Sequence, residues 1–233
     1  MASVFISKET VLRVAKDVRE IMKNPLHDHG IYYRHDEEDI LKGKALIIGP
    51  PDTPYEGGYF LFKFQFPVNY PHQPPVVTYC TNDGKTRFNP NLYRSGKVCL
   101  SVLNTWKGPQ WTGCQTISSV LLALCATVLN DKPLLNEPGI DETFDDYERY
   151  NEIIRYKTIE VAILDAVENN KYKEDFGELF DVMCEHFQNN RQSVYERIKL
   201  ENEDMRMLHT RIYNMNFYTS YKGLKERILK KMA

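Results

Sequence analysis

The first predicted element is a helix whose apolar residues recur at helical spacing. Lysine and arginine residues lie between them, so one face of the helix would be apolar and the other basic. Ser7 is a suitable N-cap, and Pro25 with the polar residues after it ends the segment. The apolar positions are Val11, Val14, Ala15, Val18 and Ile21.

Three segments with strand-like patterns follow this helix. Residues 44–48 form an apolar run, and residues 49–58 after them are dense in turn-forming residues. In residues 59–66 phenylalanine occupies every second position, which places these side chains on one face of a strand that Pro67 ends. Residues 76–80 form a further short strand. The order predicts a helix followed by an antiparallel meander.

A long stretch from Thr81 to Gln115 shows little periodicity. It contains both tryptophans and two cysteines, and this content indicates an ordered, functional loop rather than a disordered one. Thr116 then caps a predicted buried helix, and a second helical tract starts near Glu142. Further helices are expected at about residues 176–187, 192–213 and 221–232.

The change of pattern divides the chain into two regions. We expect a first domain over residues 1–141 and a helical C-terminal extension over residues 142–233. No internal repeat and no low-complexity linker separates them. The extension is therefore expected to pack on the first domain.

Composition narrows the classes of function. With 233 residues, of which 42% are hydrophobic, the chain can bury a core and does not have the composition of a disordered protein. A net charge of −2 argues against a generally basic nucleic-acid binder. The longest apolar run begins at Val120 and is about half the roughly 20 residues of a membrane span. The first residues lack the apolar core of a secretory signal, so we expect a cytoplasmic protein, with the nucleus left open.

The cysteines predict free thiols rather than a metal or disulfide framework. The chain has five, irregularly spaced, with no CxxC pair, and its six histidines show no HxxxH spacing. No GxxxxGK[ST] loop is present either. We therefore expect reduced thiols, no metal and no cofactor.

The segment Arg87–Leu103 carries the strongest chemical signal. Asn89 and Asn91 flank Pro90, and Cys99 follows eight residues after Asn91. Most lone cysteines are small buried apolar residues, but asparagines that can donate to an oxyanion make Cys99 a candidate nucleophile. No histidine lies in a protease-like context, and a thiol without an obvious base is in general a weak nucleophile near neutral pH. This setting suits exchange with an activated thioester better than attack on an amide.

Three segments in order resemble the ubiquitin-conjugating enzyme family: YEGGYFLFKFQFPVNYPHQPP, RFNPNLYRSGKVCLSVL and the helix after TGCQTISSVL. The resemblance covers about residues 7–140. RFNPN, TWKGPQW and LLNEPG narrow it to the Z-type subfamily, which carries a helical C-terminal extension. The resemblance implies an α/β (α+β) fold, with a four-stranded antiparallel sheet flanked by helices and an all-helical extension packed on it.

The resemblance also implies an activity. Cys99 would accept ubiquitin, or a ubiquitin-like modifier, as a thioester from an activating enzyme, and a substrate lysine would then attack it to form an isopeptide bond. For the Z-type subfamily this would be the non-standard activating enzyme. Asn91 matches the asparagine of the family's His-Pro-Asn motif, which stabilises an oxyanion or holds the loop. Glu137 is a candidate to orient or deprotonate the lysine, and a solvated loop carboxylate is the equal alternative.

Departures from the family pattern affect the turn and the ligase loops. Asn89 stands where the family has histidine, and because a carboxamide can also hydrogen-bond to backbone, we expect the turn at Asn89 and Pro90 to survive. His72, Thr112 and Gly113 replace residues in the two loops that normally receive a ligase. Pairing with a standard ligase therefore stays open.

The resemblance implies that the basic side of the first helix is the docking face for the activating enzyme. The alternative interpretation of these residues is an ordinary solvated helix face. Its residues are Lys8, Arg13, Lys16 and Arg19.

Three rival functions stay open. The first is a catalytically weak or inactive ubiquitin-binding variant that acts as a scaffold, although such variants lack the cysteine. The second, an unrelated cysteine hydrolase, would need a histidine base near Cys99. The third is conjugation of another modifier. Expected partners are the modifier, its activating enzyme and protein substrates, with a ligase left open and neither membrane nor nucleic acid expected.

Overall fold

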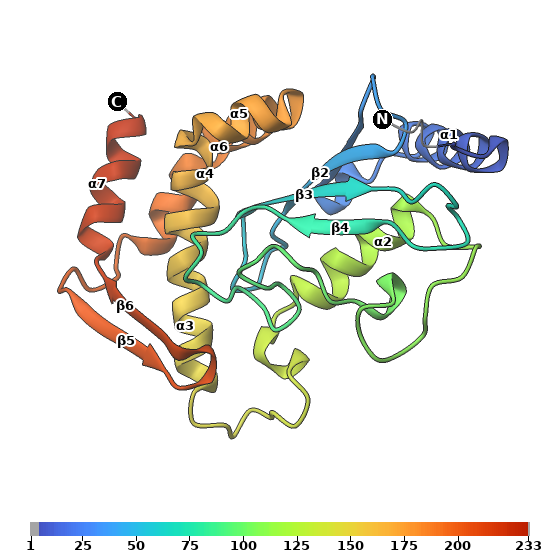
Figure 1. The fold of residues 1–233 in the computed structure, drawn as a ribbon. Helices are drawn as coiled ribbons and strands as arrows, with labels where there is room; N and C mark the ends of the chain where they lie inside the picture. Colours follow the sequence, from blue (N-terminus) through green and yellow to red (C-terminus); the bar gives the residue numbers. More distant parts are fainter. Residues whose placement is uncertain (1–4, 233) are drawn as a thin grey trace.

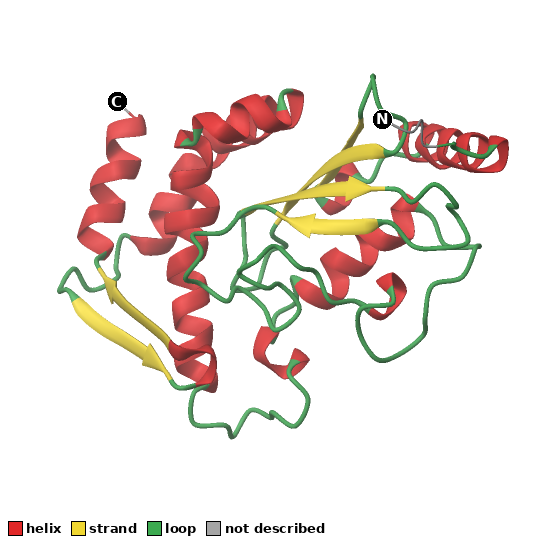
Figure 2. Ribbon diagram, in the orientation of Figure 1, coloured by secondary structure: helices red, strands yellow, loops and turns green. Residues whose placement is uncertain are grey.

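A computed structural model describes residues 5–232, which form an antiparallel sheet, helices on both of its faces and a C-terminal hairpin (Figures 1 and 2). The sheet consists of β1 (Ile31–His35), β2 (Lys42–Ile48), β3 (Tyr59–Gln65) and β4 (Val76–Tyr79), paired in that order. The helices are α1 (Lys8–Lys23), α2 (Ile117–Ala123), α3 (Tyr147–Lys157), α4 (Ala166–Glu168), α5 (Asn170–Phe176), α6 (Glu178–Ile198) and α7 (Tyr221–Met232). None of the helices within residues 5–232 combines the length and apolar character needed to cross a membrane.

The helix α1 begins and ends where its sequence predicts. Ser7 Oγ accepts a hydrogen bond from the Thr10 amide at 3.0 Å, and the helix ends two residues before Pro25. Val14 and Ile21 are buried against the rest of the core. The predicted N-cap of α2 is also confirmed, since Thr116 and Ser119 form a reciprocal capping box.

The strand β3 is buried on both faces, and this explains how the two regions fit together. Phe60, Phe62 and Phe64 lie on the face that joins the main core with α1 and α2. Tyr59 and Leu61 point the opposite way, into a second apolar cluster built with the C-terminal helices. In Figure 1 these helices stand beside the sheet, on the side away from α1.

The helix α3 continues beyond Lys157 without a break. A π-helical segment, η5 (Thr158–Asp165), connects it to α4, and this segment supplies buried apolar residues to the second cluster. The tract begins at Tyr147, five residues later than the predicted start near Glu142. Residues 141–146 are turns and irregular backbone instead.

The extension is not all-helical, which corrects the sequence prediction. The predicted helix over 192–213 is wrong beyond Ile198, where α6 ends. There β5 (Arg206–Thr210) pairs with β6 (Met215–Thr219) as an antiparallel hairpin. Alternate residues of β6 are buried, so the segment follows the period of a strand. The four-stranded sheet is confirmed, although no residue range was predicted for β1. The loop character of Thr81–Gln115 is confirmed apart from one 3-10 turn and isolated β-bridges.

The second cluster predicts that the extension and the sheet unfold together. Leu164 is fully buried there, so Leu164→Ala should lower the free energy of unfolding by about 2–5 kcal/mol. The matched control is Leu200→Ala, because Leu200 is 90% exposed and its truncation should change stability by less than about 0.5 kcal/mol. Urea unfolding followed by circular dichroism and tryptophan fluorescence should give one coincident transition. Two separate transitions would contradict this prediction.

Candidate active site

The Asn-Pro-Asn turn is held by the fully buried carboxamide of Asn89. Its Nδ2 donates to Tyr55 Oη at 3.0 Å and to the Val128 carbonyl at 2.8 Å. Its Oδ1 accepts the Asn91 amide at 2.8 Å, which closes the turn around Pro90. Burial raises the pKa of Tyr55 well above its usual value, so the phenol stays protonated and donates to the Phe88 carbonyl at 2.6 Å.

Cys99 and Asn91 are joined by a reciprocal pair of hydrogen bonds. The Cys99 amide donates to the Asn91 carbonyl at 2.9 Å. The Asn91 Nδ2 donates to the Cys99 carbonyl at 2.6 Å. In this state the Asn91 carboxamide therefore supports the backbone beside the thiol. Cys99 itself is only 2% exposed, so a reacting partner must displace part of its surroundings.

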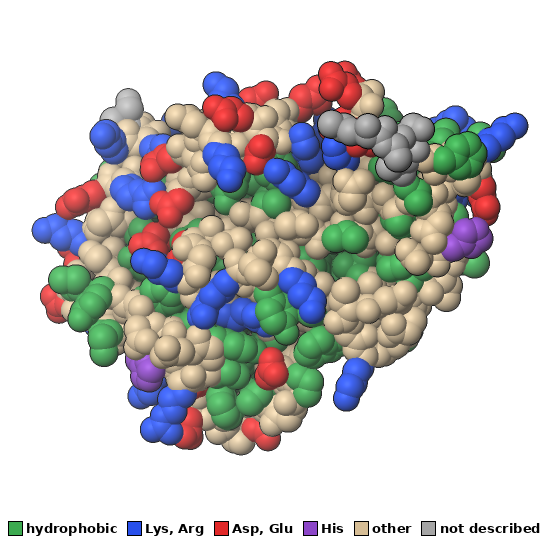
Figure 3. All heavy atoms as spheres, viewed as in Figure 1, with side chains coloured by type: hydrophobic (Ala, Val, Ile, Leu, Met, Phe, Trp, Pro, Cys, Tyr) green, Lys and Arg blue, Asp and Glu red, His purple; other side chains and the backbone are tan. Residues whose placement is uncertain are grey.

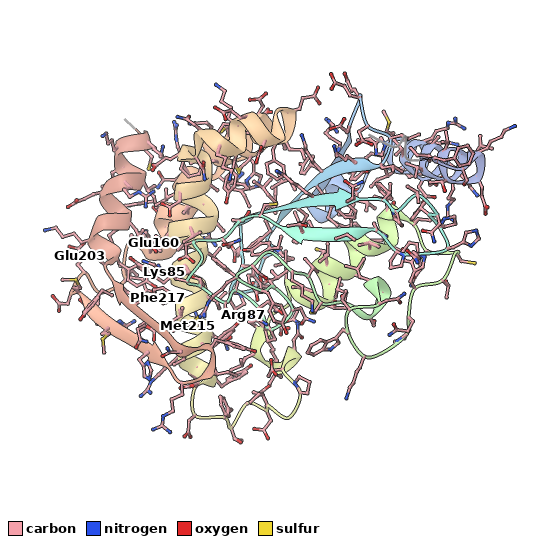
Figure 4. All side chains as sticks on the ribbon, viewed as in Figure 1. Lys85, Arg87, Glu160, Glu203, Met215 and Phe217 are labelled. Carbon is pink, nitrogen blue, oxygen red and sulfur yellow. The ribbon has the colours of Figure 1, made fainter. Side chains whose placement is uncertain are left out.

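Arg87 fastens the same turn from outside, and the sequence reasoning did not identify it. Its Nε donates to the Asn89 carbonyl at 3.1 Å and its Nη2 to the Pro90 carbonyl at 2.7 Å. The guanidinium lies 3.4 Å from the centre of the Tyr93 ring, a cation–π contact. Lys and Arg side chains gather over the middle of the face in Figure 3, in the region where Figure 4 labels Arg87. Its place directly before FNPN was the one available sequence signal.

Glu137 is held beside the Asn-Pro-Asn turn because the residue before it, Asn136, hydrogen-bonds to Asn89. Asn136 Nδ2 donates to Asn89 Oδ1 at 3.3 Å and to the Thr127 carbonyl at 2.8 Å. Glu137 is half-buried, and its Oε2 accepts a hydrogen bond from the Tyr213 hydroxyl at 2.5 Å. It is therefore not a freely solvated loop carboxylate.

The two candidate ligase loops meet at Trp111. The indole Nε1 of this buried residue donates to the Pro71 carbonyl at 2.7 Å, next to His72. The His72 side chain is 66% exposed, and its Nε2 lies 3.3 Å from Glu9 Oε1. Thr112 and Gly113 follow Trp111 on the exposed side. The structure thus brings His72, Thr112 and Gly113 into one surface region.

The basic residues of α1 do not all face solvent. Lys8, Lys16 and Arg19 are exposed. Arg13 instead pairs with Asp17 at 2.9 Å, and its guanidinium donates to two main-chain carbonyls of the loop after Trp111, those of residues 113 and 115. Arg13 therefore ties α1 to a candidate ligase loop.

The remaining cysteines and acidic residues form no metal centre. Among the described residues, 5–232, no three His, Cys, Asp or Glu side chains lie close enough together to hold a metal ion. All five cysteines in this range are free thiols, and Cys114 is the exposed one closest in sequence to Cys99.

Comparison with known proteins identifies the family. Residues 13–158 match the family model described as "Ubiquitin-conjugating enzyme". The chain is 46% identical over 165 residues to "Ubiquitin-conjugating enzyme E2 Z" of Xenopus tropicalis, a match that covers 70% of this chain and 52% of the relative. The human protein of the same name is 47% identical over 163 residues, 69% of this chain and 45% of the relative. "Probable ubiquitin-conjugating enzyme protein 17" of Caenorhabditis elegans is 36% identical over 186 residues, 75% of this chain and 25% of the relative.

These matches confirm the resemblance drawn from the sequence motifs, including the Z-type name. The chain spans about half the length of the E2 Z relatives that it matches. The matched region includes Asn89, Asn91, Cys99 and Glu137. The chain belongs to the ubiquitin-conjugating enzyme family.

Proposed function

We propose that this protein carries ubiquitin, or a ubiquitin-like modifier, as a thioester on Cys99 and transfers it to a lysine amine. The single observation that carries the proposal is the reciprocal bonding of Cys99 and Asn91 within the family's active-site segment. In the first step Cys99 Sγ forms a bond to the thioester carbonyl carbon, the activating enzyme's thiolate leaves, and the proton lost by the Cys99 thiol passes to that thiolate. In the second step the amine nitrogen forms the amide bond and the Cys99 sulfur leaves, taking up a proton as thiol.

Asn91 serves this chemistry chiefly as loop support. Its Nδ2 is engaged by the Cys99 carbonyl at 2.6 Å, so the side chain holds the backbone that carries the nucleophile. Glu137 orients the incoming lysine, because a half-buried carboxylate beside the turn attracts an ammonium group more strongly than a solvated one would.

The partners follow from the same proposal. The activating enzyme, of the non-standard kind, docks on the exposed α1 cations Lys8, Lys16 and Arg19. A ligase, where one is used, meets the region of His72, Thr112 and Gly113. Protein substrates supply the lysine. The protein acts in the cytoplasm, with the nucleus left open, because free thiols stay reduced in both compartments.

One observation favours a second candidate function. Cys99 is 2% exposed, which is low for a thiol that must reach two large partners. A protein that binds ubiquitin without being charged, as a scaffold, would keep its cysteine covered in this way. Charging distinguishes the two functions directly.

The carrier function predicts a thioester that depends on one cysteine. With ATP, ubiquitin or another modifier, and each activating enzyme in turn, the wild-type protein should give a band one modifier heavier on a non-reducing gel. The band should vanish with thiol reductant and in Cys99→Ala, and persist in Cys114→Ala, the matched control. A band that survives Cys99→Ala would contradict Cys99 as the residue that carries the modifier. No band with any modifier would contradict the carrier function and leave the scaffold function.

Loop support by Asn91 predicts a loss of stability as well as of rate. Asn91→Ala leaves the buried Cys99 carbonyl without its partner, which should lower the free energy of unfolding by about 1–3 kcal/mol. Charging and discharge should both slow. Asn190→Ala is the control, because Asn190 Nδ2 also donates to a main-chain carbonyl, at 2.8 Å, but within α6. Unchanged stability with discharge alone slowed by about 10²–10³ would indicate an oxyanion role instead.

A further inference from the structure

The tip of the C-terminal hairpin is fixed against the active-site segment. The Ile212 amide donates to Oδ2 of the buried Asp146 at 2.9 Å. The Arg87 amide contacts Met215 Sδ at 3.4 Å, and Met215 is 1% exposed. Figure 4 places Arg87 and Met215 next to each other, where the loop and the hairpin meet. The tip is thus a packed part of the molecule.

Tyr213 lies at this tip in a backbone conformation that tyrosine rarely adopts. Its φ is 60° and its ψ is 6°, in the left-handed region that favours glycine. Arg94 Nη2 donates to the Tyr213 carbonyl at 2.7 Å and holds this conformation. Strained residues of this kind concentrate at functional sites, where surrounding contacts maintain them.

The Tyr213 side chain reaches two groups of the active-site region. Its hydroxyl donates to Glu137 Oε2 at 2.5 Å. Its ring lies 5.1 Å from the Arg87 guanidinium, so Arg87 contacts both Tyr93 and Tyr213. Burial, followed by the bond to Glu137, raises the pKa of Tyr213 far above its usual value. The phenol therefore remains a protonated donor throughout the neutral and mildly alkaline range.

Both groups that Tyr213 contacts, Glu137 and Arg87, are connected to the Cys99 segment through short chains of hydrogen bonds. Asn136, next to Glu137, donates to the Asn89 carboxamide, and Asn89 in turn accepts the Asn91 amide. Arg87 donates to the carbonyls of Asn89 and Pro90. A side chain from the extension thus holds the candidate acid and contacts the arginine that fastens the catalytic turn.

We propose that Tyr213 is a positioning residue for the transfer step, which holds the Glu137 carboxylate in the orientation that receives the acceptor lysine. This inference rests on the proposed carrier function and adds a group from outside the family's core. A carboxylate has four acceptor sites on two oxygens, so one bond at Oε2 leaves acceptor sites for the amine. The ammonium group held by Glu137 first loses one proton to solvent. The neutral amine nitrogen then bonds to the thioester carbon, the carbon–sulfur bond breaks, and the second proton released by nitrogen goes to the Cys99 thiolate.

The test is single-turnover discharge of the charged full-length protein. Wild type and Tyr213→Phe are charged, the activating enzyme is stopped by removing Mg²⁺, and loss of the thioester is followed on addition of free lysine. Phenylalanine keeps the ring against Arg87 and removes only the hydroxyl. Discharge to lysine should slow about tenfold, the scale of a hydrogen bond to a charged group. Charging should stay close to wild type, and the melting temperature should fall by only a few degrees, because a single hydrogen bond is lost.

Two further measurements separate positioning from a structural role. Discharge to hydroxylamine, a neutral nucleophile that needs no carboxylate to orient an ammonium group, should be unchanged in Tyr213→Phe. In a Glu137→Gln background, which is itself slow toward lysine, Tyr213→Phe should have no additional effect. Tyr218→Phe is the matched control, because Tyr218 is 70% exposed on β6 of the same hairpin, and it should behave as wild type.

The outcomes that overturn the inference differ from those that overturn the carrier function. Three results would each overturn the positioning role of Tyr213 while leaving the carrier function of Cys99 intact. They are an unchanged rate of lysine discharge in Tyr213→Phe, an equal slowing toward lysine and hydroxylamine, and the same slowing in the Glu137→Gln background. A wild-type protein that forms no thioester on Cys99 would overturn both.

Discussion

The fully buried carboxamide of Asn89 is the constraint on which the active-site region depends. A buried amide without partners costs about 1–3 kcal/mol for each group, and this one is bonded to several separate segments. Its partners are Tyr55 before β3, Val128 after α2, Asn91 in the catalytic turn and Asn136 beside the candidate acid. Because a single rigid side chain serves all of them, moving one segment would break bonds to the others. The turn that carries the chemistry is therefore held by hydrogen bonds to each of these segments.

The extension belongs to this arrangement because it completes the outer face of the sheet. Leu46, Tyr59 and Leu61 would lie in water without it, yet all are buried against η5 and the later helices. The main core likewise includes residues of α3 and of the hairpin. The same helix that covers the sheet begins at Tyr147, directly after Asp146, the residue that anchors the hairpin tip. The packing of α3 on the sheet therefore also fixes the position of the hairpin tip.

Much of the fold was predictable from the sequence, and the elements and contacts that were missed have physical causes. Local signals were sufficient for α1, β3 and α2, and the motif singled out Cys99 and its neighbours as candidate site residues. The hairpin was missed because its turn contains neither Gly nor Pro and places Tyr213 and Asn214 at positive φ instead. Arg87 and Tyr213 could not be paired from sequence, since they are brought together only by the packing of the extension. The continuous apolar run in residues 59–62 could have predicted the second core. Apolar residues on both faces of a strand require a packed layer on each side of the sheet.

The backbone at Tyr213 argues that the hairpin tip is shaped for the active site rather than for the hairpin. A non-glycine residue in the left-handed region costs about 1 kcal/mol or more. Glycine at 213 would relieve the strain, but it would lose the hydroxyl on Glu137 and the ring beside Arg87. The strain is instead offset by contacts that exist only because the tip reaches the catalytic turn. Tyr213 thus lowers the stability of the hairpin itself while it adds contacts to the active site. This combination favours a role of Tyr213 in the chemistry over a role in folding.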